Sequence, residues 1–145
     1  MSSKVSLIRG AIKTVLESVT GIGIVHDRKR EARDWKSLLD LFRYNEEFQG
    51  IEFQQKSFEV NSDEDRLITR KWNFTLLKQF NDSENSEYIF DDLIESIFNK
   101  FQDSNLGNQI IEHTSIKLID KFEDEISDVL CHVAILELIT IDSDI

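Results

Sequence analysis

The feature that most limits the fold of this chain is a run of alternating apolar and polar residues from Arg66 to Phe80. In the segment RLITRKWNFTLLKQF, most of the even-numbered positions (one parity) carry large apolar side chains, and the odd-numbered positions carry mostly polar ones. Side chains along a strand point alternately to the two faces of a sheet, so this pattern predicts a half-buried strand. Such a strand needs other elements to cover its apolar face, which requires a layered domain.

A second strand is expected directly before the first, in the segment IEFQQKSFEV. Its apolar parity shifts between Phe53 and Phe58, and a β-bulge accounts for a shift of this kind. The polar segment NSDEDR between the two strands has the composition of a turn. Together these segments predict a long antiparallel hairpin over roughly residues 50–80.

Two segments have the spacing of amphipathic helices. Residues 3–19 carry apolar side chains one helical turn apart, and Gly21 follows as a C-terminal stop. After the N-cap-rich cluster NDSENS, apolar pairs recur from Ile89 to Phe101 and acidic residues occupy the other face. Residues 35–42 suggest a short helix or an ordered loop.

The remaining segments complete the predicted fold class. Residues 22–25 form a short apolar run typical of a strand, and TSIKLIDKF is either a strand or irregular. The acidic stretch EDEISD leads into VLCHVAILELITI, which is apolar on both parities and therefore suits a central strand covered on both faces. These segments predict an α+β fold, with a mostly antiparallel sheet of about four strands packed against two or three helices.

The length of 145 residues fits one domain spanning 1–145. The N-terminus lacks the layout of a signal peptide, and no window approaches the roughly 20 apolar residues of a membrane span, so a soluble protein is expected. Cys131 is the only cysteine, which excludes an internal disulfide and favours a buried, reduced thiol in a protein made in the cytosol.

Charge is unevenly distributed along the chain. The net charge is −11, yet residues 1–72 have a net charge of +1 and residues 73–145 have a net charge of −12. The overall acidity argues against a general nucleic-acid binder, whose affinity comes from lysine and arginine. This charge asymmetry can orient partner proteins or other copies of the chain. An acidic surface that only keeps the protein soluble gives the same charge distribution.

The segment GIGIVHDRKREARDW resembles a nucleotide-binding loop only in part. Gly21 and Gly23 match the first two glycines of a G-x-G-x-x-G pattern, but His26 occupies the third position. A dinucleotide site also requires a strand before the glycines and a helix after them, and here a helix comes first. We therefore expect no nucleotide cofactor.

Other catalytic or metal-binding patterns are also missing from the sequence. His26, His113 and His132 lie far apart, and none has a second ligand at the short spacing of a metal site. Cys131 and His132 are neighbours that would point to opposite faces of a strand, which disfavours a nucleophile pair. We expect no catalytic residues, no metal and no cofactor.

The densest basic cluster of the chain directly follows the glycines. Arg28, Lys29, Arg30, Arg33 and Lys36 are mixed with three acidic residues. The cluster fits a solvated loop or a contact with the acidic surface of a neighbouring protein, and the intermixed acids weaken it as a nucleic-acid site. Arginine beside tryptophan is typical of protein interfaces, so the candidate interface residues are Arg28, Arg30, Arg33 and Trp35.

The order of these segments resembles a known family. An N-terminal amphipathic helix is followed by GIGIVHDR, RKWNFTLLKQF, EYIFDDLIESIFNKFQ and finally VLCHVAILELITI. This arrangement is similar to that of the tail terminator and tail completion proteins of tailed bacteriophages and related prophages. The resemblance covers most of the chain and departs from the family pattern in the acidic stretch near residues 117–128.

The resemblance implies a non-enzymatic structural protein of the virion. Such a subunit is assembled in the bacterial cytoplasm and forms a ring, commonly a hexamer, at the end of the tail tube. The implied partners are other copies of the chain, the tail tube protein and the head connector protein, with no membrane and no specific nucleic acid. Two alternatives stay open, a head–tail joining or neck protein of the same virion and an acidic interaction protein that mimics DNA.

Overall fold

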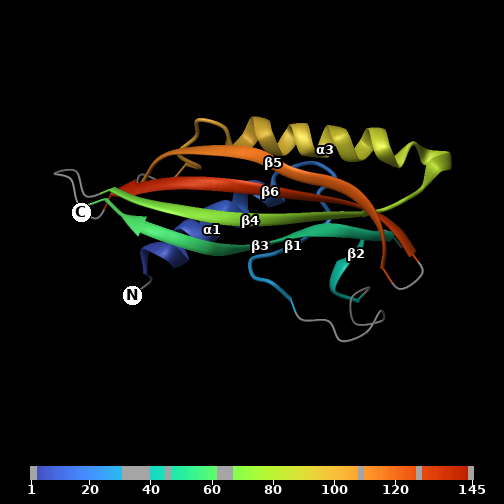
Figure 1. The fold of residues 1–145 in the computed structure, drawn as a ribbon, viewed down its shortest axis with the longest axis horizontal. Helices are drawn as coiled ribbons and strands as arrows, with labels where there is room; N and C mark the ends of the chain where they lie inside the picture. Colours follow the sequence, from blue (N-terminus) through green and yellow to red (C-terminus); the bar gives the residue numbers. More distant parts are fainter. Residues whose placement is uncertain are drawn as a thin grey trace.

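A mixed β-sheet of six strands organises the chain (Figure 1). The computed structural model describes residues 3–30, 40–44, 47–61, 67–107, 110–126 and 129–143. The strands are β1 (Ile24–His26), β2 (Arg43–Tyr44), β3 (Glu47–Val60), β4 (Leu67–Gln79), β5 (Ile111–Ile126) and β6 (Val129–Ser143). Five of them follow the order β1-β3-β4-β6-β5, and β2 pairs with β3. The pairing of β1 with β3 is parallel, and the other pairings are antiparallel.

The predicted α+β fold, with a mostly antiparallel sheet of about four strands on two or three helices, is wrong. The sheet has six strands, it is mixed, and strands dominate the described residues. Two features hid this from the sequence. β2 is too short for its period to be recognised, and β5 continues through the acidic residues 123–125 instead of ending before them.

The long hairpin is confirmed, and it includes the predicted irregularity. β3 and β4 pair along their length, and their register shifts between Gln55 and Ser57. The alternation along β4 is also confirmed, because Trp72, Phe74 and Leu76 are buried in the main core. The segment 62–66, which contains most of the expected turn, lies outside the described residues.

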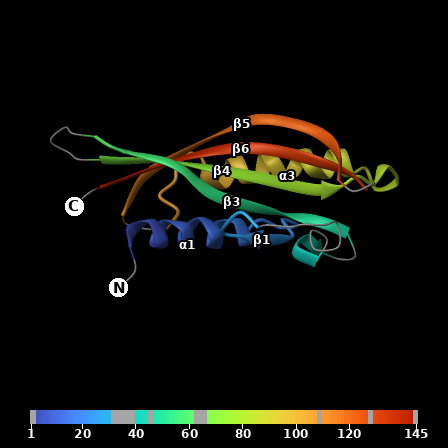
Figure 2. The ribbon, with the colours of Figure 1, turned by 60° about the horizontal axis from the view of Figure 1, so that its bottom comes forward.

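The two predicted amphipathic helices are confirmed as α1 (Lys4–Glu17) and α3 (Ser86–Phe101). Both lie lengthwise along the sheet (Figures 1 and 2). α1 buries Ile8, Ile12 and Leu16, which are spaced four residues apart, and its Ser3 cap accepts a hydrogen bond from the backbone of Ser6. A 3-10 turn, η1 (Asp82–Glu84), precedes α3. Among the described residues, no helix has the length and apolar character needed to cross a bilayer.

The core is divided between the two faces of the sheet. The larger cluster joins both helices to the sheet residues of one parity, and the ring of Phe74 packs 5.4 Å from that of Phe101 in α3. Burial of an aromatic side chain of this size contributes about 1.5–3 kcal/mol. A smaller cluster on the opposite face covers one end of the sheet, with Phe42, Phe48, Leu77, Cys131 and Val133. Further along this second face, Gln54, Asn73 and Thr75 are half-buried.

Gly23 of the GIG segment and Gly50 of β3 allow the close approach of β1 to β3. Gly23 has φ of +84°, and a Cβ atom there would lie 2.6 Å from the backbone oxygen of Gln49. Across the pair, a Cβ on Gly50 would lie 2.5 Å from the backbone oxygen of Ile24. Larger side chains are excluded at both positions. The segment therefore builds the fold rather than cradling a phosphate.

Candidate functional site

The predicted interface cluster begins where β1 ends. The side chain of Arg28 is 67% exposed, and its Nη1 lies 3.3 Å from Oδ1 of Asp27. An exposed ion pair contributes at most about 1 kcal/mol, so the guanidinium of Arg28 is available to a partner. Two other predicted interface residues, Arg33 and Trp35, lie outside the described residues.

Arg30, in contrast, is tied to the sheet. Its backbone N–H donates to Oε2 of Glu52 at 3.1 Å, and its Nη1 lies 3.3 Å from Nδ1 of His26. Nε2 of His26 lies 2.6 Å from the carbonyl oxygen of Leu41, which can only accept. The ring therefore carries its proton on Nε2, and Nδ1 accepts from Arg30. With the edge of Phe42 packed at 5.0 Å, His26 has a structural role that fixes residues 40–42 against β1.

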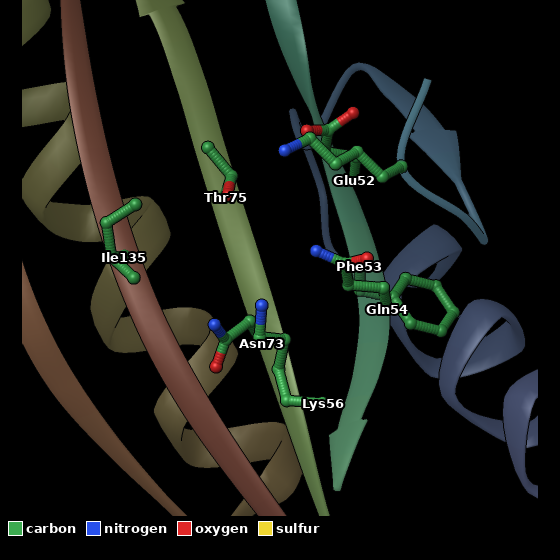
Figure 3. Close-up of a pocket in the computed structure, with 8 residues that line it drawn as sticks. Glu52, Phe53, Gln54, Lys56, Asn73, Thr75 and Ile135 are labelled. Carbon is green, nitrogen blue, oxygen red and sulfur yellow. The ribbon is translucent and has the colours of Figure 1, made fainter. Parts of the chain in front are cut away.

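A pocket of about 200 Å³ lies beside this basic segment, on the face of the sheet opposite α1 and α3. Figure 3 shows Glu52 and Gln54 of β3 opposite Asn73 and Thr75 of β4. The remaining lining residues are Lys29, Phe53, Lys56 and Ile135. This volume is below the roughly 300–1,000 Å³ of small-molecule sites, and the lining is polar with charges of both signs. The pocket suits a side chain of a protein partner better than a cofactor.

The acidic half of the chain provides the opposite edge of the sheet. In β5, Asp120, Glu123, Asp124 and Glu125 are exposed. The two lysines of the strand have acidic partners within the chain: Nζ of Lys117 lies 3.6 Å from Glu137, and Nζ of Lys121 lies 2.6 Å from Asp91 of α3. The hydrogen bond that Lys121 donates to Asp91 raises the pKa of Lys121. The outward charge of this edge is therefore negative.

A serine, a histidine and a glutamate converge where α3 begins. Oγ of Ser86 lies 2.9 Å from Nε2 of His132, and it accepts a hydrogen bond from the backbone of Asn81 at 2.8 Å. The hydroxyl hydrogen of Ser86 is then directed to Nε2. Nδ1 of His132 has no hydrogen-bond partner among the described residues, and its nearest carboxylate is Oε1 of Glu123 at 3.9 Å.

The burial of this group argues against nucleophilic catalysis. Ser86 and His132 are almost fully buried, and the histidine ring is stacked between Phe80 and Phe90 at 4.9 and 5.2 Å. Burial lowers the pKa of His132, and the charge of Glu123 opposes that effect only in part. The neutral, buried ring of His132 accepts a hydrogen bond from Ser86 and so joins β6 to the start of α3. This role is structural.

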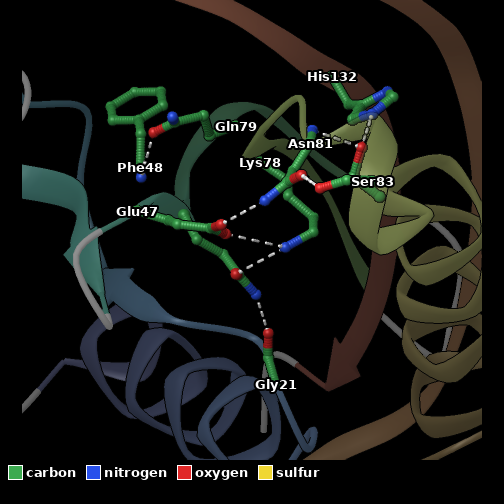
Figure 4. Close-up of polar contacts among 10 residues, drawn as sticks. Gly21, Glu47, Phe48, Lys78, Gln79, Asn81, Ser83 and His132 are labelled. Carbon is green, nitrogen blue, oxygen red and sulfur yellow. Dashed lines mark hydrogen bonds and ion pairs between the residues drawn. The ribbon is translucent and has the colours of Figure 1, made fainter.

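A second polar network surrounds Lys78 (Figure 4). Its Nζ donates to Oε1 of Gln49 at 3.1 Å and lies 3.6 Å from Oε2 of Glu47. The amide of Gln49 donates to the carbonyl of Gly21, and the amide of Asn81 donates to Glu47 at 3.3 Å. The network links the loop after α1 to β3 and to the end of β4. Its polar groups bind one another, and Gln49 and Lys78 also line a pocket of about 360 Å³.

Cys131 and His132 point to opposite faces of β6, as the sequence predicts. His132 lies under α3, whereas Cys131 belongs to the small apolar cluster on the other face. Burial raises the pKa of Cys131 to about 11, which leaves the thiol protonated and unreactive at neutral pH. Within the described ranges, no group of three or more His, Cys, Asp or Glu residues is placed to hold a metal ion.

Sequence reasoning missed the partners of these polar residues. The pairs Ser86–His132 and Lys78–Gln49 are 46 and 29 residues apart in the chain; packing of α3 on β6 brings the first pair together, and pairing of β3 with β4 brings the second. A signal was present, because Lys78 and His132 are polar residues on the apolar parity of their strands. Polar residues on a buried parity need partners, although the sequence does not identify them.

Comparison with known proteins adds no family assignment. The sequence matches no protein-family model and no curated protein.

Proposed function

We propose that this chain is a structural subunit of a phage virion that forms a ring at the end of the tail tube. The ring ends polymerisation of the tube and offers the surface that joins the head. This proposal follows the resemblance to tail terminator and tail completion proteins. It has one main structural support, which is the placement of opposite charges at opposite edges of one sheet.

The two charged edges suit head-to-tail assembly. Arg28 and Lys29 are exposed beside the β1 and β3 edge, and the exposed acids of β5 lie at the other edge. A contact between two different patches of the same subunit repeats from copy to copy, and it closes into a ring when the rotation allows. Attraction between the patches also guides their encounter and fixes their relative placement.

The polar clusters of the described residues also favour an assembly role over catalysis. Ser86 and His132 are buried, and Lys78 is engaged by Gln49 and Glu47. The exposed pocket near Lys29 is small and mixed in charge. These sites stabilise the fold or accept a side chain of a partner, and none offers a convergent set of reactive groups.

The proposal is tested by native mass spectrometry and negative-stain imaging of the protein, alone and with tail tubes. We expect a ring on the tube end and no further tube growth after it binds. A monomer in isolation remains consistent with the proposal, since such rings can form only on the tube. A protein that stays monomeric at high concentration and never caps a tube contradicts it.

Two further measurements separate the alternatives. Binding to head connectors without any binding to tubes supports a neck protein. Competition with DNA for a basic partner supports a DNA mimic.

A further inference from the structure

The outer edge of β5 is covered over only part of its length. The backbone N–H of Asp103 donates to the carbonyl of Thr114 at 2.9 Å, and the side chain of Gln102 accepts from the N–H of Ile116 at 3.1 Å. From Lys117 onward, β6 is the only strand paired with β5 among the described residues. In Figure 2 this part of β5 forms the upper margin of the ribbon.

The free part of β5 carries exposed apolar side chains. Leu118, Ile119 and Phe122 are 40%, 51% and 36% exposed. Leu118 and Ile119 lie at a bulge, because the register with β6 shifts between Leu118 and Asp120, and Phe122 follows it. Natural proteins cover or blunt long edges of this kind, since unpaired backbone groups beside apolar side chains accept a further strand. This edge has the character of an unfilled strand site.

The opposite side of the sheet has a second free edge. β1 pairs with β3 only from Gly50 to Glu52, so the stretch of β3 from 54 to 60 has only β4 beside it among the described strands. Ser57 is exposed there, as are the large side chains of Phe58 and Val60. Within the described part of the chain, one molecule therefore offers two unfilled strand positions, one on each side.

Strand direction determines how these edges can meet. Each step from β3 through β4 and β6 to β5 is antiparallel, so β5 runs opposite to β3. When a neighbouring copy in a ring keeps its strands in the same direction, its β3 meets β5 in antiparallel fashion. Neighbouring copies must also be offset along the strands, because the free part of β3 lies level with the covered part of β5. Strands in closed barrels have a comparable stagger.

Charge favours this pairing over a pairing of two β5 strands. A symmetric contact of β5 with itself would place Glu123, Asp124 and Glu125 against the same acids, while Lys117 and Lys121 already face acids of their own chain. The β3 edge, by comparison, carries one exposed base, Lys56, and one exposed acid, Glu59, so that stretch is neutral, and the exposed Arg28 and Lys29 lie nearby. Opposite charges across strands stabilise pairing, and like charges oppose it.

We propose that residues 117–126 of β5 add as an antiparallel strand to residues 54–60 of β3 in a second copy of this chain. The sheet then continues from subunit to subunit, with Leu118, Ile119 and Phe122 buried at the junction. This inference rests on the proposed ring function and specifies the contact that builds the ring. Its main-chain hydrogen bonds are those of β-strand addition.

The test uses cysteines and a short bis-maleimide cross-linker, applied to the protein alone and on tail tubes. The double variant Ile119→Cys with Ser57→Cys places one thiol on each edge. We expect it to give a ladder of covalent oligomers that stops at the ring size, whereas each single variant gives none. Wild-type protein controls for the native thiol, since Cys131 is buried with a raised pKa. The matched control pairs Ser57→Cys with Glu95→Cys, on the exposed side of α3, and it should give no ladder.

The outcomes distinguish this contact from the proposed function. Capped tubes without the 119–57 ladder overturn the edge contact and leave the ring function standing. A ladder without capping supports the contact and contradicts the tube-end function. Dimers from the Ile119→Cys single variant would show a symmetric β5 contact and overturn the proposal. Circular dichroism and thermal melting of every variant confirm that a missing ladder does not reflect a misfolded protein.

Discussion

Nε of Arg70 lies 3.0 Å from Oδ1 of Asp142, and both side chains are buried although 72 residues separate them in the chain. Nη1 of the same arginine donates to Oε1 of Gln55 at 3.1 Å. The second oxygen of Asp142 has no hydrogen-bond partner among the described residues. The ion pair therefore joins β3, β4 and β6 at one end of the sheet, and it leaves a carboxylate that depends on Arg70.

Removal of that arginine should be costly. Arg70→Met leaves the carboxylate of Asp142 buried without its counter-charge, and we expect a loss of about 3–5 kcal/mol in the free energy of unfolding, measured by urea denaturation. The matched control is Lys117→Met, which breaks the exposed pair with Glu137 and should cost less than about 1 kcal/mol. Equal losses in the two variants would contradict the structural importance of the buried pair.

The double variant Arg70→Met with Asp142→Leu should recover much of that loss, because no unpaired charge remains in the interior. If the double variant is as unstable as Arg70→Met alone, the loss of stability comes from lost side-chain packing and not from the unpaired carboxylate of Asp142.

Gly23 should tolerate no side chain. Gly23→Ala places a methyl group 2.6 Å from the backbone oxygen of Gln49 at a φ of +84°, so β1 must separate from β3. Gly107→Ala is the control, since its φ is +70° and no atom lies within 4 Å of the added carbon. We expect the control to lose about 1 kcal/mol from backbone strain and Gly23→Ala to lose clearly more, as measured by thermal and urea unfolding. Similar losses would show that the close contact is relieved cheaply.

Folding stability should fall in mild acid because of His132. Burial lowers the pKa of this histidine in the folded protein, against the opposing charges of Glu123 and Glu87 and with minor contributions from Lys121 and Lys78. The unfolded chain then binds a proton near pH 6.5 that the folded chain resists. Stability is therefore fully present above about pH 6.5 and decreases as the pH falls below it.

Urea unfolding at a series of pH values from about 7.5 to 5 measures this slope. His132→Gln should be less stable at neutral pH and should lose most of the slope, while the exposed control His113→Gln should keep it. A slope that is unchanged in His132→Gln would assign the pH dependence to other groups.

Arg28 provides the cleanest test of the basic cluster in assembly. Its side chain is exposed and its one ion pair is weak, so Arg28→Glu should leave the melting temperature nearly unchanged. Ring formation on tail tubes should weaken, as measured by the fraction of capped tubes in negative-stain images. Lys100→Glu makes the same change of charge at the exposed end of α3 and should assemble normally. Equal capping by both variants would remove Arg28 from the interface.

The sequence was sufficient to predict the elements with a strong period. Helices α1 and α3, the hairpin of β3 and β4, and the bulge near Lys56 all follow from apolar spacing over ten or more residues. It was not sufficient for β5, because the acids at 123–125 have the composition of a turn. On an edge strand such residues can face solvent, and Lys121 holds the strand to Asp91 of α3.

Only the local sequence of the candidate site was predictable, and its neighbours from distant strands were not. The position of the basic cluster after a short strand was predicted, but Glu52 and Lys56, which line a pocket with Lys29, lie more than twenty residues later in the chain. The parallel pairing of β1 with β3 brings these residues together. No periodic pattern in the sequence between the two strands predicts that pairing. Proximity of this kind depends on topology, which short-range patterns do not encode.

The position of α1 and α3 on a single face has a consequence for curvature. In any ring closed through the two edges, the bulkier layer requires the longer circumference, so the helices would form the outer wall and the strands would line the bore. The bore would then present the open face of β3 and β4, with Gln54, Asn73 and Thr75. Together with Glu52 and Lys56 on the same face, these amides and hydroxyls would give a polar inner surface with charges of both signs, which would attract a passing molecule only weakly.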